Sequence, residues 1–284
     1  MSTFAGSSYV LDNDRPAARR VLGCLSLMLD EFTIGRLAQA GVPVGGRCLE
    51  LGAGNGSVAC WLAERVGARG QVVATDVNIQ HIRQHPGVTV LRHDAAVEPL
   101  PAGPFDLVHA RLLLAHLPSR YEVLARMVEV LRPGGLLLVE EFGQAGTGMV
   151  LSSPDRAGAE IYCEFQGALA EVYAAAGTDA GWAVQVNGTM TEVGLVTVDT
   201  VTHARSWTGG TAGCALPLAL SMELREQLIA AGMVERELDR LARLLVDPQL
   251  VLMGDLLWSH LGRRPQRPTG AAEVVGVGHN RGQW

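Results

Sequence analysis

The chain has 284 residues, of which 48% are hydrophobic, and its formal net charge is −6. This length suits one large domain or a core with a lid, and the hydrophobic content can fill a substantial core. The acidic balance and the absence of a basic block argue against nucleic acid as a partner. All 23 basic residues are Arg, which excludes chemistry that needs a Schiff-base lysine.

The cysteines predict a reducing compartment. They are scattered without a C-x-x-C pair, so we expect reduced structural thiols in a cytoplasmic protein. The first eleven residues are polar and lack the apolar segment of a signal peptide. No apolar run reaches the roughly 18 residues that a membrane span needs. The five cysteines are Cys24, Cys48, Cys60, Cys163 and Cys214.

Residues 1–45 are predicted to form a polar tail followed by helices. Asp14 is a candidate helix cap, and Pro16 would occupy the first turn. The segment from Leu22 to Leu29 is strongly apolar and indicates a helix. A turn rich in glycine, at 41–46, then ends this N-terminal unit.

Strands and helices alternate from the turn at 41–46 to residue 141. The run at 135–139 is continuously apolar, as expected for a parallel strand that is buried on both faces. Such alternation predicts a doubly wound α/β sheet. We expect strands at 47–51, 71–75, 88–91, 105–110 and 135–139, and helices at 57–66 and 120–131.

The pattern changes after residue 141. A helix is predicted over 155–176, because apolar residues recur there at helical spacing. Residues 263–284 are rich in Gly, Pro and Arg, which predicts a mobile tail. Between these segments we expect a β-branched strand at 195–202, helices at 222–231 and 234–245, and a last strand within 249–261.

Residues 50–56 read Glu-Leu-Gly-Ala-Gly-Asn-Gly, between a predicted strand and a predicted helix. Such a glycine turn lets backbone amides approach a nucleotide-like ligand, because no Cβ intervenes. Ser57 stands where the dinucleotide fingerprint requires its third small residue. The acidic residue Glu50 precedes the glycines, and Asp76 follows at a distance typical of a ribose-binding carboxylate. An ordinary tight turn is the alternative.

This pattern resembles motif I and the acidic loop of class I S-adenosylmethionine (SAM) methyltransferases. Residues 45–141 resemble the catalytic core of that family. The segments at 9–13, 247–248 and 261–265 extend the resemblance to bacterial small-molecule methyltransferases, many of which serve secondary metabolism, including antibiotic biosynthesis. The resemblance implies SAM as cofactor, S-adenosylhomocysteine as product, and no metal.

The implied fold is a Rossmann-like, doubly wound sheet of seven strands, with N-terminal helices and a helical lid insertion after strand five. The domains expected from it are an N-terminal helical lid at 1–45, a SAM-binding core at 46–141, a helical insertion over the acceptor pocket at 142–190, the C-terminal part of the core sheet with helices at 191–262, and a flexible tail at 263–284.

The resemblance also assigns cofactor contacts. Glu50 would bind the amino group of SAM, Asp76 the ribose hydroxyls, and Asp94 the adenine amino group. A helix cap is the alternative for Asp76, and His93 is expected to pack near the adenine edge. Tyr9, with Arg19 or Arg20, would belong to a segment that folds over SAM. The full cofactor set is Glu50, Gly52, Ala53, Gly54, Gly56, Asp76, Val77, Asp94, Ala95, Ala110, Arg111 and Tyr9.

The candidate catalytic residues are His116, Glu141 and His109. His116 follows the fourth strand and suits a general base with a pKa near neutral pH, although it could instead cap a helix or line the methionine pocket. Glu141 could face the acceptor or end its strand in solvent, and His109 could face the core. The sequence His-Ala-Arg-Leu at 109–112 lacks the tetrapeptide of enzymes that methylate nucleic-acid bases, and no metal-binding carboxylates stand near it.

The acceptor pocket is expected between the N-terminal helices and the helix at 155–176. Apolar walls with few polar groups suit a small organic acceptor; packing of this stripe on the sheet is the alternative. The candidate substrate-binding residues are Tyr162, Phe165, Leu169, Tyr173 and Glu164, the last of which stacks on Glu160 at i, i+4.

The predicted function is methyl transfer from SAM to an O, N or C atom of a small metabolite in natural-product biosynthesis. The alternatives are a SAM-binding protein that catalyses a cyclisation or rearrangement, and a non-catalytic ligand-binding scaffold. We expect a small-molecule acceptor as partner, neither nucleic acid nor membrane, and leave a homodimer open.

Overall fold

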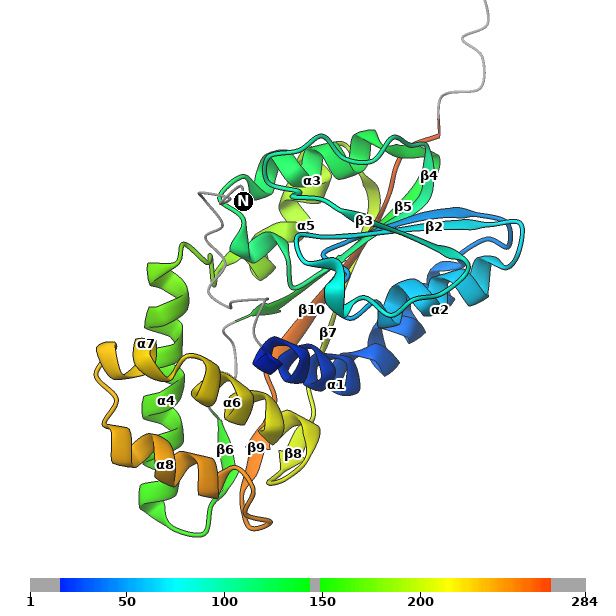
Figure 1. Cartoon of the computed structure of the whole chain (residues 1–284). Coiled ribbons are helices and arrows are strands. Elements are labelled where there is room, and N and C mark those ends of the chain that lie inside the picture. Colours follow the sequence, from blue (N-terminus) through cyan, green and yellow to red (C-terminus); the bar gives the residue numbers. More distant parts are fainter. Residues whose placement is uncertain (1–15, 144–148, 267–284) are drawn as a thin grey trace, which may run out of the picture.

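The computed structural model of the chain describes residues 16–143 and 149–266. It shows a large twisted sheet with helices on both faces and, to one side, a lobe made mostly of helices (Figure 1). Within the predicted N-terminal unit, the described part is one long helix, α1 (Pro16–Ala40), where the sequence predicts several. The candidates Tyr9 and Asp14 lie outside the described residues. None of the described helices is long and apolar enough to cross a bilayer.

The described residues form a seven-stranded central sheet with the order β3-β2-β1-β4-β5-β10-β7. Five neighbouring strands are parallel, and β10 runs antiparallel to both β5 and β7. The predicted doubly wound, seven-stranded fold is therefore confirmed. The strands are β1 (Arg47–Leu51), β2 (Gln71–Asp76), β3 (Val88–Arg92), β4 (Phe105–Arg111), β5 (Leu131–Gly143), β7 (Val196–His203) and β10 (Leu256–Arg263).

The order of the sheet reverses between β1 and β4. Ligands bind beside such a switch point, at the carboxyl ends of the parallel strands. The helix α2 (Ser57–Val66) and the C-terminal half of α1 cover one face of the sheet, where Leu37 belongs to the same hydrophobic cluster as Cys48 and Leu107. The opposite face carries α3 (Arg120–Glu129) and α5 (Trp182–Glu192). Both layers shield β1, β4 and β5, which explains the apolar runs of these strands.

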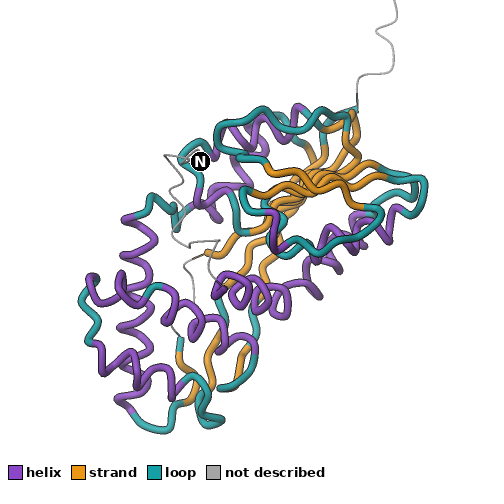
Figure 2. The backbone as a smooth tube through the Cα atoms, viewed as in Figure 1, coloured by secondary structure: helices purple, strands orange, loops and turns teal. Residues whose placement is uncertain are grey.

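The second lobe packs four helices against a small antiparallel sheet of order β6-β9-β8 (Figure 2). Its first helix, α4 (Arg156–Ala175), confirms the helix predicted at 155–176, and Asp155 caps it by accepting a 2.6 Å hydrogen bond from the Gly158 amide. The remaining elements of the lobe are β6 (Val150–Ser152), β8 (Ser206–Thr208), α6 (Ala212–Glu223), α7 (Arg225–Ala230), α8 (Glu235–Leu244) and β9 (Val251–Met253).

The segment after residue 203 differs from its prediction. The first helix begins at Ala212, ten residues before the predicted start, and tolerates Pro217 in its interior. The strand expected within 249–261 is divided into β9 and β10, which join different sheets. Strands of three residues are too short to show a recognisable alternation of apolar and polar side chains. They are stabilised by partner strands from distant segments, which the local sequence does not reveal.

Helix α1 connects the two parts of the molecule. Val21, Met28 and Leu29 of its first half belong to the hydrophobic cluster of the lobe, whereas Leu37 belongs to the cluster beneath the sheet. One helix with apolar residues on several sides therefore serves two cores. As a result, α1 lies across the edge of the sheet where the ligand site is expected.

Phe165 of α4 is fully buried in the cluster of the lobe. Its replacement by Ala removes the ring and leaves a cavity, so we expect Phe165→Ala to lower the free energy of unfolding by about 3–5 kcal/mol. Urea denaturation followed by circular dichroism measures this loss. The exposed Val184→Ala serves as the control, with an expected change within about 0.5 kcal/mol. Equal stability of the two variants would contradict the packing described here.

Candidate active site

A cavity of about 660 Å³ lies at the carboxyl ends of β1, β2, β4 and β5. Its other walls come from α1, α4 and α6, so both parts of the molecule contribute to it. Most of the predicted cofactor residues line this cavity, namely Glu50, Gly52, Ala53, Gly54, Asp76, Val77, Asp94, Ala95 and Arg111, together with His116, Glu141, Leu169 and Tyr173 from the other two sets.

The glycine turn forms the floor of the cavity between β1 and α2. Gly52 and Gly54 adopt left-handed conformations, with φ of 66° and 57°. A Cβ on Gly54 would stand 3.0 Å from Leu22 of α1, so glycine also allows α1 to approach the turn. Gly56, by contrast, directly precedes α2 and faces Ile82 instead of the cavity. Glycine at this position therefore allows the start of α2 to pack closely against Ile82.

Asp76 ends β2 with its carboxylate held against the glycine turn. Its Oδ2 accepts a 2.9 Å hydrogen bond from the Gly54 amide, and its Oδ1 accepts a 3.0 Å bond from the Asn78 amide. Burial raises the pKa of Asp76, and these bonds partly offset the effect. A carboxylate has about four acceptor positions, so Asp76 keeps acceptor capacity for ligand hydroxyls beside these amides. The following 3₁₀ turn, η1 (Ile79–His81), is capped by Asn78 and not by Asp76.

Asp94 and His93 form the wall beyond β3. The Oδ1 of Asp94 accepts a 2.9 Å hydrogen bond from the Ala96 amide, and the residue lines the cavity. The Nε2 of His93 lies 3.1 Å from the Pro99 carbonyl oxygen. Its Nδ1 is buried and makes no hydrogen bond within the described part of the chain. This segment therefore offers both a carboxylate and a buried ring nitrogen to a ligand.

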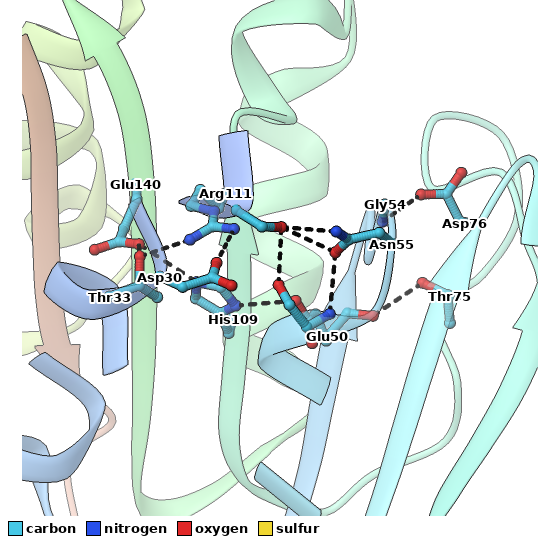
Figure 3. Close-up of polar contacts among 12 residues, drawn as sticks. Asp30, Thr33, Glu50, Gly54, Asn55, Thr75, Asp76, His109, Arg111 and Glu140 are labelled. Atoms are coloured by element: carbon cyan, nitrogen blue, oxygen red, sulfur yellow. Dashed lines mark hydrogen bonds and ion pairs between the residues drawn. The ribbon is translucent and has the colours of Figure 1, made fainter. Parts of the chain in front are cut away.

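A buried row of charged side chains crosses the sheet behind the cavity (Figure 3). Glu50 of β1, His109 of β4 and Glu140 of β5 all lie on the face covered by α1. The His109 Nδ1 is 3.6 Å from Glu50, and its Nε2 is 3.7 Å from Glu140. Burial alone would lower the pKa of His109, but the two glutamates outweigh it and the pKa is raised. Protonated His109 thus neutralises part of the charge of two buried carboxylates.

Helix α1 extends this row. The Thr33 hydroxyl donates a 2.6 Å hydrogen bond to Glu140 and accepts a 2.9 Å bond from Arg111. Arg111 also forms a 2.8 Å ion pair with Asp30 (Figure 3). Burial would raise the pKa of Glu140, but His109, Thr33 and Arg111 outweigh it and the pKa is lowered. Arg111 therefore fastens α1 to the sheet as well as lining the cavity.

His109 and Ala110 do not reach the cavity. Both are fully buried in β4, with His109 between the two glutamates and Ala110 packed in the core on the opposite face. The structure therefore contradicts the prediction of His109 as a catalytic group and of Ala110 as a cofactor contact. At residues 109 and 110 both faces of β4 are covered by helices, which leaves these two side chains no access to a ligand.

Glu141 braces the 3₁₀ turn η2 (Leu114–His116). Its Oε1 accepts hydrogen bonds from the amides of Leu114 and Ala115, at 2.7 and 3.3 Å. Burial raises the pKa of Glu141 to about 8. The side chain is 1% exposed, so the alternative prediction, that Glu141 ends its strand in solvent, is wrong. Glu141 thus positions the turn that carries His116.

His116 lines the cavity from the end of that turn. Its Nδ1 is 3.0 Å from the Thr178 hydroxyl, and its ring lies 5.9 Å from the ring of Tyr173. Burial and the charge of Arg120 lower the pKa of His116 to about 4. This value is well below the near-neutral pKa expected for a general base, so at neutral pH the imidazole is uncharged and only weakly basic. A catalytic role for His116 stays a prediction.

Helix α4 turns only part of its predicted substrate-binding face to the cavity. Leu169 and Tyr173 line it, as does Gln166. Phe165 and Tyr162 are instead buried in the core of the lobe, because α7 and α8 pack against α4. Glu164 is exposed to solvent on the outer side. The predicted roles of Tyr162, Phe165 and Glu164 as cavity walls are therefore wrong.

Several cavity residues have no sequence signal that would reveal them. Asn55 is the exception, because it stands inside the glycine turn. The contributions of α1 and α6 depend on how those helices dock, and Asp255 belongs to a short connection without a motif. Arg19 and Arg20 are exposed on α1. The additional cavity residues include Leu22, Leu25, Ser26, Asn55, His81, Gln166, Thr178, Asp179, Leu216, Leu220 and Asp255. Among the described residues, no cluster of three or more His, Cys, Asp or Glu side chains suits a metal ion.

Comparison with known proteins gives matches over the core. Residues 49–139 match the family model described as a methyltransferase domain. Methyltransferase str3 of Strobilurus tenacellus is 38% identical over 97 residues, which is 34% of this chain and 35% of that protein. The ubiquinone/menaquinone biosynthesis C-methyltransferase UbiE of Cupriavidus taiwanensis is 36% identical over 121 residues, or 40% of this chain and 49% of the relative. The chain thus spans less than half the length of these relatives.

Solved structures match over more of the chain at low identity. Phosphoethanolamine N-methyltransferase 2 of Haemonchus contortus, in complex with S-adenosylhomocysteine, has a TM-score of 0.56 at 14% identity and covers 89% of this chain and 60% of its own. A protein of Bacillus halodurans assigned as a methyltransferase has a TM-score of 0.53 at 16% identity and covers 82% and 98%. At these identities the matches show the fold.

Replacing His109 by Asn should destabilise the protein, because Glu50 and Glu140 would remain buried without their shared cation. We expect a loss of about 3–5 kcal/mol in the free energy of unfolding near pH 6. The raised pKa of His109 means that its contribution is complete below its ordinary value of 6.5 and is lost as the pH rises through the folded-state pKa. The lowered pKa of Glu140 adds a contribution that is complete above 4.5 and is lost as the pH falls through the folded-state pKa.

Urea denaturation of the wild type and His109→Asn between pH 5 and pH 9 measures this difference. Taking the difference removes the titration of Glu141, which both proteins share. The advantage of the wild type should be largest between pH 4.5 and 6.5 and should shrink at higher pH. His85→Asn, in the loop before β3, is the control. An advantage that grows between pH 6.5 and pH 9 would show that His109 is not the cation of this row.

Proposed function

We propose that this chain is a class I, SAM-dependent methyltransferase, which transfers a methyl group from SAM to a small organic acceptor. One observation carries the proposal. Glu50, Asp76 and Asp94 come from three different strand ends, yet all three line one cavity above the glycine turn. A carboxylate at each of these places matches the three hydrogen-bonding parts of SAM, its amino group, its ribose and its adenine.

The residues present fit this cofactor. The Oε2 of Glu50 is buried without a hydrogen-bond partner in the described part of the chain, as expected for an oxygen that receives an ammonium group. The remaining acceptor positions of Asp76 suit two ribose hydroxyls. Asp94 and the free Nδ1 of His93 suit the polar edge of adenine. We assign these roles to Glu50, Asp76, Asp94 and His93.

The chain's own contribution to the reaction is binding and orientation. When bound, SAM supplies a methyl group on a sulfonium that is already activated for displacement. The glycine turn and the three carboxylates hold one end of the cavity, whereas α4 and α6 wall the other end with Leu169, Leu216 and Leu220. These apolar walls exclude water, and alignment of two reactants in such a site supplies much of the rate enhancement. Through its Oε1, the side chain of Glu141 holds the turn between the two ends.

For the acceptor we propose only a chemical class, a small organic molecule. The relatives named above include a quinone C-methyltransferase and a phosphoethanolamine N-methyltransferase, whose acceptors differ widely. The relatives matched by sequence align over 34% and 40% of this chain, so they do not identify the acceptor that the lobe would bind. A place in natural-product biosynthesis is supported by the resemblance of the flanking segments alone.

Calorimetric titration of SAM and S-adenosylhomocysteine tests the cofactor assignment. We expect Asp76→Ala to weaken the affinity for SAM by about 1–3 kcal/mol, because two ribose hydroxyls lose their acceptor. This loss corresponds to roughly 5-fold to 150-fold in the dissociation constant. Glu64→Ala, an exposed carboxylate on α2, is the matched control and should bind like the wild type. Unchanged affinity in Asp76→Ala would refute the ribose assignment, and no binding by the folded wild type would refute the cofactor.

Methyl transfer itself is measured with methyl-labelled SAM and panels of amines, phenols, quinones and alcohols. Label in an acceptor together with equimolar S-adenosylhomocysteine supports the proposed function. Conversion of a substrate without S-adenosylhomocysteine would instead indicate a cyclisation or rearrangement on the same fold.

A further inference from the structure

The acceptor end of the cavity contains a carboxylate that no sequence motif predicts. Asp255 directly precedes β10, whose first residue, Leu256, pairs with Gly143 at the end of β5. Because β10 runs antiparallel to β5, its start lies at the carboxyl edge of the parallel strands, where the cavity opens. Asp255 therefore lines the same cavity as Glu50 and Asp76 but enters it from the connection with the lobe.

Asp255 has no counter-ion in the part of the chain that the structure describes. Within residues 16–143 and 149–266, its carboxylate makes no hydrogen bond or ion pair at the distances that define the other contacts of the site. Arg111, the arginine in the cavity wall, is already paired with Asp30. The hydroxyl of Tyr162, whose pKa is raised by burial and then by the charge of Asp255, accepts a 2.7 Å hydrogen bond from Gln166. The surrounding groups therefore leave the charge of Asp255 facing the cavity.

The walls around this carboxylate are apolar. Phe142, Leu169, Leu216 and Leu220 line the cavity from β5, α4 and α6. Burial raises the pKa of Asp255 to about 6, so most of the carboxylate is ionised at neutral pH. An enclosed negative charge without a partner is costly, and the low dielectric that makes it costly also strengthens its attraction to a cation. A ligand with an apolar body and one positive group matches both features.

We propose that Asp255 is the anionic anchor of the acceptor end, and that this end takes an apolar molecule carrying a protonated amine. The inference rests on the proposed function, because it treats this end of the cavity as the acceptor site. Neutral His116 and the hydrogen-bonded Gln166 would then orient the amine without competing for its charge. Apolar contacts would supply affinity, and Asp255 would supply selectivity for charge.

Three probes of equal length test this selectivity. We would titrate 4-phenylbutylamine, 4-phenylbutanol and 4-phenylbutyrate into the full chain saturated with S-adenosylhomocysteine. The amine should bind about tenfold or more tightly than the alcohol, as a hydrogen bond between charged groups predicts, and the carboxylate should bind most weakly. In Asp255→Asn, the difference between amine and alcohol should fall to within about twofold.

Glu164→Gln is the matched control, because it removes one negative charge from the exposed side of α4 and should keep the full preference for the amine. The thermal midpoint of Asp255→Asn should not fall below that of the wild type, since the variant removes an unpaired enclosed charge. This second measurement separates a lost contact from a lost fold.

Equal binding of amine and alcohol by the wild type, a preference that survives in Asp255→Asn, or no binding of any probe would each overturn the inference. In all three cases S-adenosylhomocysteine would still bind, which leaves the proposed function standing. Failure of S-adenosylhomocysteine to bind the folded wild type would overturn the proposed function, and the inference with it.

Discussion

The row Glu50–His109–Glu140 is the interaction on which the rest of the site depends. Three adjacent strands each place an ionisable side chain on the same face, and α1 covers all three. Two carboxylates could not be buried there without a cation between them, because the desolvation of each costs several kcal/mol. His109 supplies that cation at 3.6 and 3.7 Å, so it stabilises both carboxylates in the part of the sheet beneath the cavity.

The same row explains why α1 lies where it does. Thr33 donates a hydrogen bond to Glu140, and Asp30 pairs with Arg111, so polar contacts add to the apolar packing of the helix. Ser26, one turn earlier, exchanges hydrogen bonds with Asn55 in the glycine turn. These contacts make three features depend on one another: the burial of the charges, the docking of α1 and the shape of the glycine turn. A change in any of them alters the wall that faces the cofactor end of the cavity.

The two ends of the cavity have different structural origins. The cofactor end is made from strand ends and the glycine turn, within the residues that match the methyltransferase domain family. The acceptor end is made from α4, α6 and the connection before β10, which lie outside residues 49–139. Function resides in sites and not in folds, so a shared core with a different lobe suits a shared cofactor with a different acceptor. Asp255 belongs to that second, variable part.

The sequence by itself determined the doubly wound core and its glycine turn, because these rest on local signals. The signals are apolar runs, periodic spacing of apolar residues and the glycines before Ser57, and each acts within a few residues. They predict the core and, from it, Asp76 and Asp94 as cavity residues. Tertiary structure alone decided the rest. The burial of His109 between glutamates 59 and 31 residues away, the side of α4 that carries Phe165, and the arrival of Asp255 at the cavity all depend on contacts between distant segments. No local pattern reports such contacts, since the free energy that stabilises them comes from packing and desolvation after the chain has folded.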